Sequence, residues 1–202
     1  MGRNLKLNST MKEERRANIL SGALRLFAAN GLSATKISDI ARETAMSQGL
    51  VYHYFDSKEA IFTELMKTAF EKLIHACTTL ENMSVTPDQK IIMAIQGLVA
   101  GIRDNEDVAR YHLLIAQASI SDSIPEEARQ IISEKRDIPY TIMKNIIQGG
   151  QHMGLIRSHD AMELSILFWT SINGLAIYRS SHGASCSLPD TSLLTALFIE
   201  EK

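Results

Sequence analysis

The sequence predicts an all-α protein with three short helices at the N-terminus and a larger helical body. Leu, Ile, Ala and Met are plentiful in the 202 residues while aromatic residues make up only 6%, a balance that favours helices over a β-sandwich. Apolar residues recur at helical spacing, and no segment shows convincing period-two alternation. Helix caps and breakers fall between these segments.

The N-terminal part contains three short helical segments. The first is predicted to begin near Met11 and to end at Asn30-Gly31, where glycine supplies a C-terminal stop. Thr35 is expected to cap the second, and Ser47 to cap a third that runs through Phe55. The apolar face predicted to hold the second and third helices together consists of Ile37, Ile40, Ala41, Val51 and Phe55.

Two longer helices follow, each opened by a recognisable cap. Asp56-Ser57-Lys58-Glu59 has the Asp-x-x-Glu form of a capping box and predicts a helix to about Leu80. Thr86-Pro87-Asp88-Gln89 combines a cap, an N1 proline and an N3 partner, and predicts a helix to about Arg103.

The remaining chain fits four or five further helices. One is predicted over 105–120, and one or two over 125–152, where Pro139 forces a kink or a break. A capping box at residues 160–163 opens a helix to about Ser181, and a last helix follows Pro189.

Composition and charge limit the functions that the chain can have. Two cysteines exclude a disulfide scaffold, the N-terminus lacks a secretory signal, and Leu164–Tyr178 is too short to span a membrane, so a cytoplasmic protein is expected. The first 58 residues carry nine basic and five acidic side chains, a net +4 that leaves −6 for the rest of a chain whose total is −2. A basic head on an acidic body is typical of nucleic-acid binding, although ordinary surface charge gives the same pattern.

Three short helices with tight turns form a helix-turn-helix pattern. The start of its third helix enters the major groove, where Gln48 can contact adenine and Leu50 a thymine methyl group. Gly49 permits close backbone approach, and Tyr52, His53 and Tyr54 carry donors suited to phosphate.

The head resembles the TetR family of bacterial transcriptional regulators. The resemblance covers roughly residues 11–60 and rests on Thr35 to Ala41, Ala45 to Phe55 and Ser57 to Glu59. It implies about nine helices, a homodimer formed through the last two long helices, a palindromic double-stranded DNA operator, and release of that operator by a small molecule bound in the body. It also assigns phosphate contacts to Thr35, Tyr52, His53 and Lys58, and base contacts to Lys36, Gln48, Gly49 and Leu50. Together with Ser47 and Tyr54, these are the predicted DNA-binding residues.

The expected domain organisation has three parts. Residues 1–10 form a flexible arm, residues 11–57 the helix-turn-helix domain, and residues 58–202 a ligand-binding and dimerisation domain. The alternative for Tyr52 and Tyr54 is packing against the fourth helix, and for Lys36 and Lys58 a solvated surface position.

Several polar and methionine residues lie within apolar helical segments of the body and are candidates for binding an unknown small-molecule effector. They are Met66, Met93, Gln96, Tyr111, His112, Gln117, Met143, Asn145, Trp169 and Asn173. Burial in an ordinary core is the alternative for each. The dimer is predicted from an excess of apolar residues in the C-terminal third: Ile166, Trp169, Thr170, Asn173, Ile177 and the run Leu193-Leu194-Ala196-Leu197-Phe198.

Metal, cofactor and enzymatic functions are not expected. His152 with His159, and His182 with Cys186, do not complete a four-ligand zinc set. The chain has no Gly-x-Ser-x-Gly, phosphate loop or paired metal motif. The alternative to a ligand-responsive regulator is a DNA-bound adaptor that acts through a protein partner.

Overall fold

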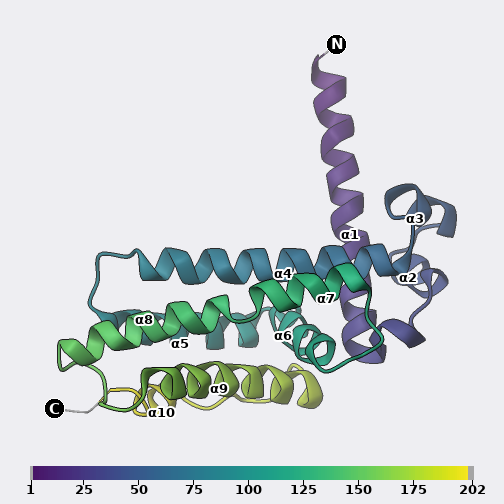
Figure 1. Ribbon diagram of the computed structural model, residues 1–202. Helices are drawn as coiled ribbons and strands as arrows, with labels where there is room; N and C mark the ends of the chain where they lie inside the picture. The colour runs from purple at the N-terminus through teal and green to yellow at the C-terminus, as the bar shows by residue number, and fades with distance from the viewer. Residues whose placement is uncertain (1, 200–202) are drawn as a thin grey trace.

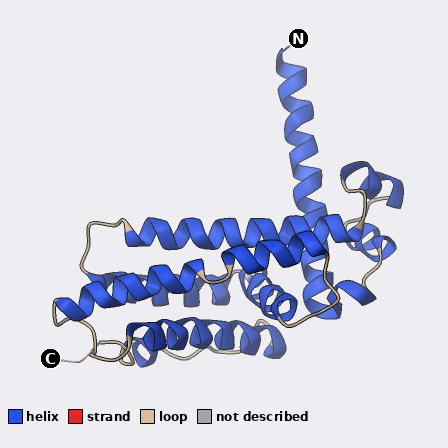
Figure 2. Cartoon of the chain, in the orientation of Figure 1, coloured by secondary structure: helices blue, strands red, loops and turns tan. Residues whose placement is uncertain are grey.

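The computed structural model describes residues 2–199, and over that range it contains helices and loops but no strand (Figure 2). The helices are α1 Gly2–Ala34, α2 Ile37–Glu43, α3 Gln48–Tyr54, α4 Lys58–Glu81, α5 Pro87–Asp104, α6 Glu106–Ser119, α7 Glu126–Lys135, α8 Ile138–His152, α9 Ala161–His182 and α10 Thr191–Thr195. The predicted all-α fold, with a helix-turn-helix head and a helical body, is confirmed. None of the helices described is long and apolar enough to cross a membrane.

The head lies at one end of the molecule and α10 at the other (Figure 1). Helix α4 runs from the head along the body, and the N-terminal half of α1 projects away from the body (Figure 1). Helix α1 begins at Gly2 rather than near Met11, so the backbone of residues 2–10 continues the helix. No proline or glycine interrupts residues 3–10, and nothing there stops a helix from continuing.

Capping residues explain where most helices begin. The Ser47 hydroxyl accepts from the Leu50 amide, and Asp160 accepts from two amides of α9, as predicted. Two predicted caps are one residue off. Lys36 occupies the cap of α2 in place of Thr35, and Ser57 caps α4 in place of Asp56, its hydroxyl accepting from the Ala60 amide at 3.1 Å. The predicted stop at Gly31 is confirmed, because that residue has φ 76° and kinks the helix.

Two apolar clusters form the core. The first joins the three head helices to the N-terminal half of α4 and to α6 and α7; the second joins α5, α8, α9 and residues near α10. All five residues of the predicted packing face in α2 and α3 are buried in the first cluster, which confirms that prediction. The head therefore shares one continuous apolar core with α4, α6 and α7.

Candidate DNA-binding surface and ligand cavity

Helix α3 buries one side and exposes the other. Val51 is fully buried, whereas Gln48, Gly49, Tyr52 and His53 are exposed. The turn before α3 contains Ala45 in the left-handed region at φ 53°, which holds α2 and α3 at a sharp angle. The exposed side thus carries the polar and small residues predicted to meet DNA.

A groove of about 370 Å³ separates α3 from the starts of α2 and α4. Lys36 and Ser38 line it on the α2 side, Gln48 and Tyr52 on the α3 side. Its α4 edge carries Asp56 and Glu59. The favourable edge for a phosphate is therefore the one between α2 and α3, where Lys36 is exposed.

Two predicted phosphate contacts are made with the protein itself. The Thr35 side chain is 1% exposed, and its hydroxyl donates to the Gly31 carbonyl at 2.8 Å. Lys58 Nζ donates to the carbonyls of Leu32, Ser33 and Thr35 at 2.8, 3.2 and 2.9 Å. These contacts satisfy all three ammonium hydrogens of Lys58, so its side chain holds the turn between α1 and α2 instead of facing a phosphate. The Thr35 hydroxyl is buried and already paired, and a contact of Thr35 with DNA stays a prediction.

The other predicted head residues are divided between the surface and the interior. Ser47 is exposed with its hydroxyl used as a cap, and Leu50 is half-buried. Tyr54 is half-buried and packs against the first core cluster, beside the His53 ring at 5.3 Å between centroids. The alternative of packing therefore describes Tyr54, whereas Tyr52 is 51% exposed.

Sequence reasoning missed Arg16, which fixes the end of α3. Its guanidinium lies 4.3 Å above the Phe55 ring, pairs with Glu64 at 3.1 Å, and is 3.5 Å from the Tyr54 carbonyl. One side chain thus connects α1, the end of α3 and α4. Its position on the apolar face of the first helix gave no signal beyond an ordinary surface arginine.

The body contains a cavity of about 400 Å³ between α4, α6, the start of α8 and α9. Three of the predicted ligand residues line it together, His112, Trp169 and Asn173. The residues that sequence reasoning missed come mainly from the junction of α7 and α8 and from apolar positions that look like core: Phe70, Leu73, Ile115, Ala116, Ser119, Arg136, Asp137, Pro139 and Tyr140.

His112 and Asn173 form the polar centre of this cavity. The His112 Nδ1 lies 2.8 Å from the Asn173 Oδ1. Burial lowers the pKa of His112 from its ordinary value, against the opposing effect of the hydrogen bond to Asn173. Burial therefore favours the neutral form of the imidazole. The Trp169 indole donates to the Pro139 carbonyl at 3.2 Å, so its N–H is already satisfied.

The other predicted ligand residues lie elsewhere. Met66 and Met143 are buried, one in each core cluster, and Tyr111 packs against the first cluster. Gln117 donates to the Ala28 carbonyl at 3.3 Å and lines a separate hollow of about 280 Å³. The three that are exposed on the surface, away from the cavity, are Met93, Gln96 and Asn145. Met93, Gln96 and Asn145 lie on helix faces that turn away from the contact between α6 and α9. The sequence does not show which helix faces border that contact.

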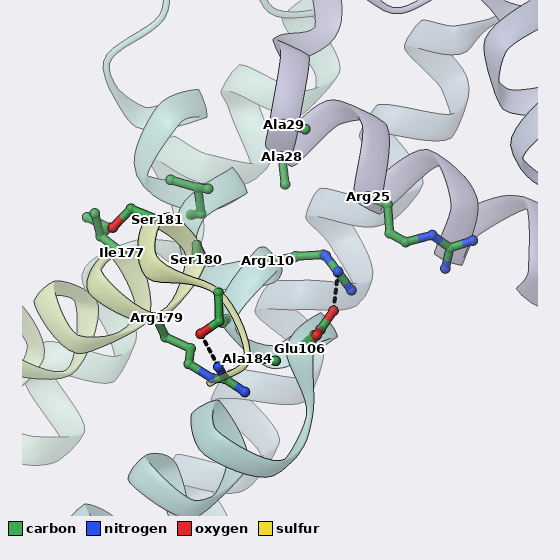
Figure 3. Close-up of a pocket in the computed structure, with 13 residues that line it drawn as sticks. Arg25, Ala28, Ala29, Glu106, Arg110, Ile177, Arg179, Ser180, Ser181 and Ala184 are labelled. Atoms are coloured by element: carbon green, nitrogen blue, oxygen red, sulfur yellow. Dashed lines mark hydrogen bonds and ion pairs between the residues drawn. The ribbon is translucent and has the colours of Figure 1, made fainter. Parts of the chain in front are cut away.

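A second cavity, of about 470 Å³, lies where the head meets the body, between α1, α6 and the end of α9 (Figure 3). Arg110 pairs there with Glu106 (Figure 3). It also pairs with Asp107 at 2.9 Å. Arg179 is buried and donates to the carbonyls of Gly183 and, at 3.1 Å, Arg103. Arg110 is thus paired with carboxylates, whereas the Nε atom of Arg179 is buried without a hydrogen-bond partner among the described residues.

A polar bridge joins the head to the body at this junction. The Ser21 hydroxyl of α1 donates to Asp107 of α6 at 3.2 Å and accepts from Arg25 at 2.9 Å. Arg25 in turn pairs with Glu43 of α2 at 2.7 Å. Since α6 also carries His112, the helix that borders the cavity beside His112 is hydrogen-bonded to the head.

Among the residues described, no three His, Cys, Asp or Glu side chains lie together as a metal ion would require. The two cysteines are free thiols, Cys77 buried and Cys186 half-buried.

Comparison with known proteins agrees with this geometry. Residues 19–65 match the model of the bacterial regulatory proteins of the tetR family. The chain is 25% identical over 177 residues to the HTH-type transcriptional repressor KstR2 of Rhodococcus jostii, covering 88% of this chain and 85% of that protein.

Solved structures share the fold. The MbdR regulator from Azoarcus sp. CIB superposes with a TM-score of 0.76 at 23% identity, covering 90% of this chain and 93% of that one. A regulator from Saccharomonospora viridis, solved in complex with choline, superposes with a TM-score of 0.66 at 22% identity, covering 94% and 100%. The head, residues 19–65, thus matches the model of the bacterial regulatory proteins of the tetR family, and the chain as a whole shares the fold of these solved regulators.

Proposed function

We propose that this protein is a ligand-responsive repressor that binds a palindromic operator as a homodimer and is released by a small molecule bound in the body. The observation that carries the proposal is the exposed side of α3, where Gln48, Gly49, Tyr52 and His53 face solvent above a buried packing face. Such a surface suits the major groove. The relative named KstR2 is a repressor, which supports repression as the sign of regulation.

The dimer is proposed through an apolar surface on α9 and α10. Ile166 is 46% exposed, and Leu193 on α10 is 65% exposed. The further apolar residues on this surface are Leu167, Ile177, Tyr178 and Leu197. Gly174 lies among them, and the space beyond its Cα is open, which lets a partner helix approach closely. Trp169 and Phe198, predicted to face a partner, are instead buried within the chain, and Asn173 lines the ligand cavity.

The release step is proposed to run through α6. A ligand beside His112 would press on α6, which reaches the head through Asp107 and Ser21. A shift of α6 changes the position of α1 and therefore the spacing of the two recognition helices in a dimer. The cavity beside His112 favours this mechanism over that of an adaptor without a small-molecule effector.

The test is selection of bound DNA from a random duplex pool by the purified protein at near-physiological salt. Enrichment of a palindrome whose half-sites lie about one helical turn or a multiple apart is the expected result. The enriched duplex then serves as the probe in screening compounds for release. Salt-sensitive binding without enrichment of any sequence would overturn the proposal, because non-specific binding depends on phosphate contacts alone.

A further inference from the structure

The cavity between α4, α6, the start of α8 and α9 has walls that suit a ring system. Phe70, Tyr140 and Trp169 line it with aromatic surface, and Leu73 and Ile115 add aliphatic surface. A volume of about 400 Å³ is within the range of small-molecule sites. The walls therefore favour an apolar, cyclic ligand.

The cavity has little net charge to offer. Its two ionised residues, Arg136 and Asp137, are adjacent at the α7–α8 junction and form an ion pair at 3.8 Å. Both are exposed, so they belong to the mouth of the cavity. Because the two opposite charges are close together, their electrostatic effects on a ligand largely cancel. A charged ligand would lose its hydration on entering the cavity and would find no unpaired opposite charge to compensate. An uncharged ligand fits better.

The hydrogen bond between His112 and Asn173 determines which polar group the ligand must bring. An amide oxygen only accepts hydrogen bonds, so the contact of Asn173 Oδ1 assigns the proton of the neutral imidazole to Nδ1. His112 Nε2 is then an acceptor, and no described side chain or amide donates to it. Two other polar groups of the lining are occupied: the Trp169 N–H donates to the Pro139 carbonyl, and the Ser119 hydroxyl donates to the Ile115 carbonyl at 2.8 Å.

Resting on the proposed function, we propose that the effector is an uncharged ring compound with a hydroxyl group that donates a hydrogen bond to Nε2 of His112. The hydroxyl completes the pairing of a polar atom inside an apolar cavity. A ligand with only an acceptor, such as a ketone, brings two lone pairs together and leaves Nε2 without a partner. The site therefore discriminates between an alcohol and the ketone of the same ring.

The protonation state of the site supports this selectivity. Burial lowers the pKa of His112, so the acceptor lone pair persists through neutral pH. The titratable groups that line the same cavity are Arg136, Asp137 and Tyr140, and burial raises the pKa of the Tyr140 phenol. Helices α4 and α9 present Phe70, Leu73, Trp169 and Asn173 to the cavity, none of which titrates.

The experiment compares decahydro-2-naphthol with decahydro-2-naphthalenone, two compounds that share one ring system and differ in the hydroxyl or carbonyl group. Affinity is measured by isothermal titration calorimetry. Trp169 is the single tryptophan of the chain and lines the cavity, so a change in the intensity or wavelength of its fluorescence reports occupancy of this site. The alcohol is expected to bind at least about tenfold more tightly than the ketone.

Two variants and a control test the role of His112. His112→Phe is expected to bind both compounds with similar affinity, and His112→Gln to reduce the preference, since an amide offers both a donor and an acceptor. His75→Phe changes an exposed histidine of α4 outside the cavity and should keep the preference. Far-ultraviolet circular dichroism shows whether each variant is folded, and His112→Gln keeps the test valid if His112→Phe is not.

Three results would overturn the inference: equal or tighter binding of the ketone, a preference that survives in both His112 variants, or no change in this fluorescence with either compound up to its solubility limit. These measurements use no DNA, so they fail independently of the proposed function. A protein that selects an operator but prefers the ketone refutes only the ligand class. A protein that prefers the alcohol but selects no operator refutes the proposed regulator.

Discussion

The ammonium group of Lys58, at the start of α4, lies 2.8 Å from the carbonyl oxygen of Leu32, at the end of α1. Two more carbonyls, of Ser33 and Thr35, complete its hydrogen bonds. A lysine at this position of the motif is expected to bind phosphate, but the Lys58 ammonium instead caps the C-terminal carbonyls of α1. The positive charge thus stabilises the connection on which the position of α2 depends.

Replacing Lys58 with methionine should destabilise the fold. Lys58→Met keeps the apolar stem but removes three hydrogen bonds to carbonyls, at a cost of about 1–3 kcal/mol. Thermal unfolding should show a melting temperature lower by several degrees. Lys36→Met, at an exposed position of the same groove, is the matched control and should weaken DNA binding without changing the melting temperature. Equal melting temperatures for the two variants would contradict the structural role of Lys58.

Gln48 and Lys36 should contribute to DNA binding in different ways. Gln48→Ala is expected to relax the preference at one base pair of each half-site by about 1–3 kcal/mol, because a bidentate contact is lost. Lys36→Ala should weaken binding to all sequences alike and reduce the salt dependence, because it removes a phosphate contact. Fluorescence anisotropy with the selected operator and single-base variants separates the two. Unchanged base preference in Gln48→Ala would exclude it as a reader.

The exposed apolar surface of α9 should carry the dimer. Ile166→Glu places one charge from each subunit in a symmetric interface and is expected to weaken dimerisation at least about 100-fold, since an unpaired charge is costly to bury. Sedimentation velocity at micromolar concentration measures the change. Ile120→Glu is the control, because Ile120 is 87% exposed at the end of α6, outside this surface. A wild-type protein that sediments as a monomer would refute the predicted dimer.

The hydrogen bond between Ser21 and Asp107 should couple the cavity to the head. Ser21→Ala is expected to leave operator affinity within about threefold and to reduce the release caused by saturating decahydro-2-naphthol by about 0.5–2 kcal/mol of coupling free energy. Anisotropy titrations with and without the alcohol give this value. Ser133→Ala, at an exposed position of α7, should release DNA as the wild type does. Unchanged release by Ser21→Ala would show that the signal takes another route.

The two thiols should differ in reactivity. Burial, with the nearby Glu81 carboxylate, raises the pKa of Cys77 to about 12, so at pH 8 the reactive thiolate is present in only about one molecule in ten thousand. Cys186 is half-buried outside the helices. We expect a chromogenic thiol reagent, whose absorbance counts the thiols that have reacted, to label one cysteine per native chain at pH 8 and two after denaturation. Rapid labelling of both in the native protein would contradict the burial of Cys77.

The sequence by itself determined the local structure and the function class of this protein. The apolar face of Ile37, Ile40 and Val51 is buried as its spacing predicts. Apolar residues at helical spacing lie on one side of a helix, and that side packs against the core. Ser47, Thr86 and Asp160 cap their helices, since capping depends on atoms within three residues. The motif over residues 11–60 was long enough to indicate the TetR family.

Only the tertiary structure decided which distant residues meet. His112 and Asn173 are 61 residues apart, and their contact depends on how α6 and α9 cross. Trp169 faces inward and Met93 outward, although both lie in apolar helical segments. Lys58 has a phosphate-binding position in the motif but finds carbonyls at the end of α1. The partner of a side chain depends on how whole helices are placed relative to one another. This placement results from packing between segments that are far apart in the chain, so local propensity and periodicity do not encode it.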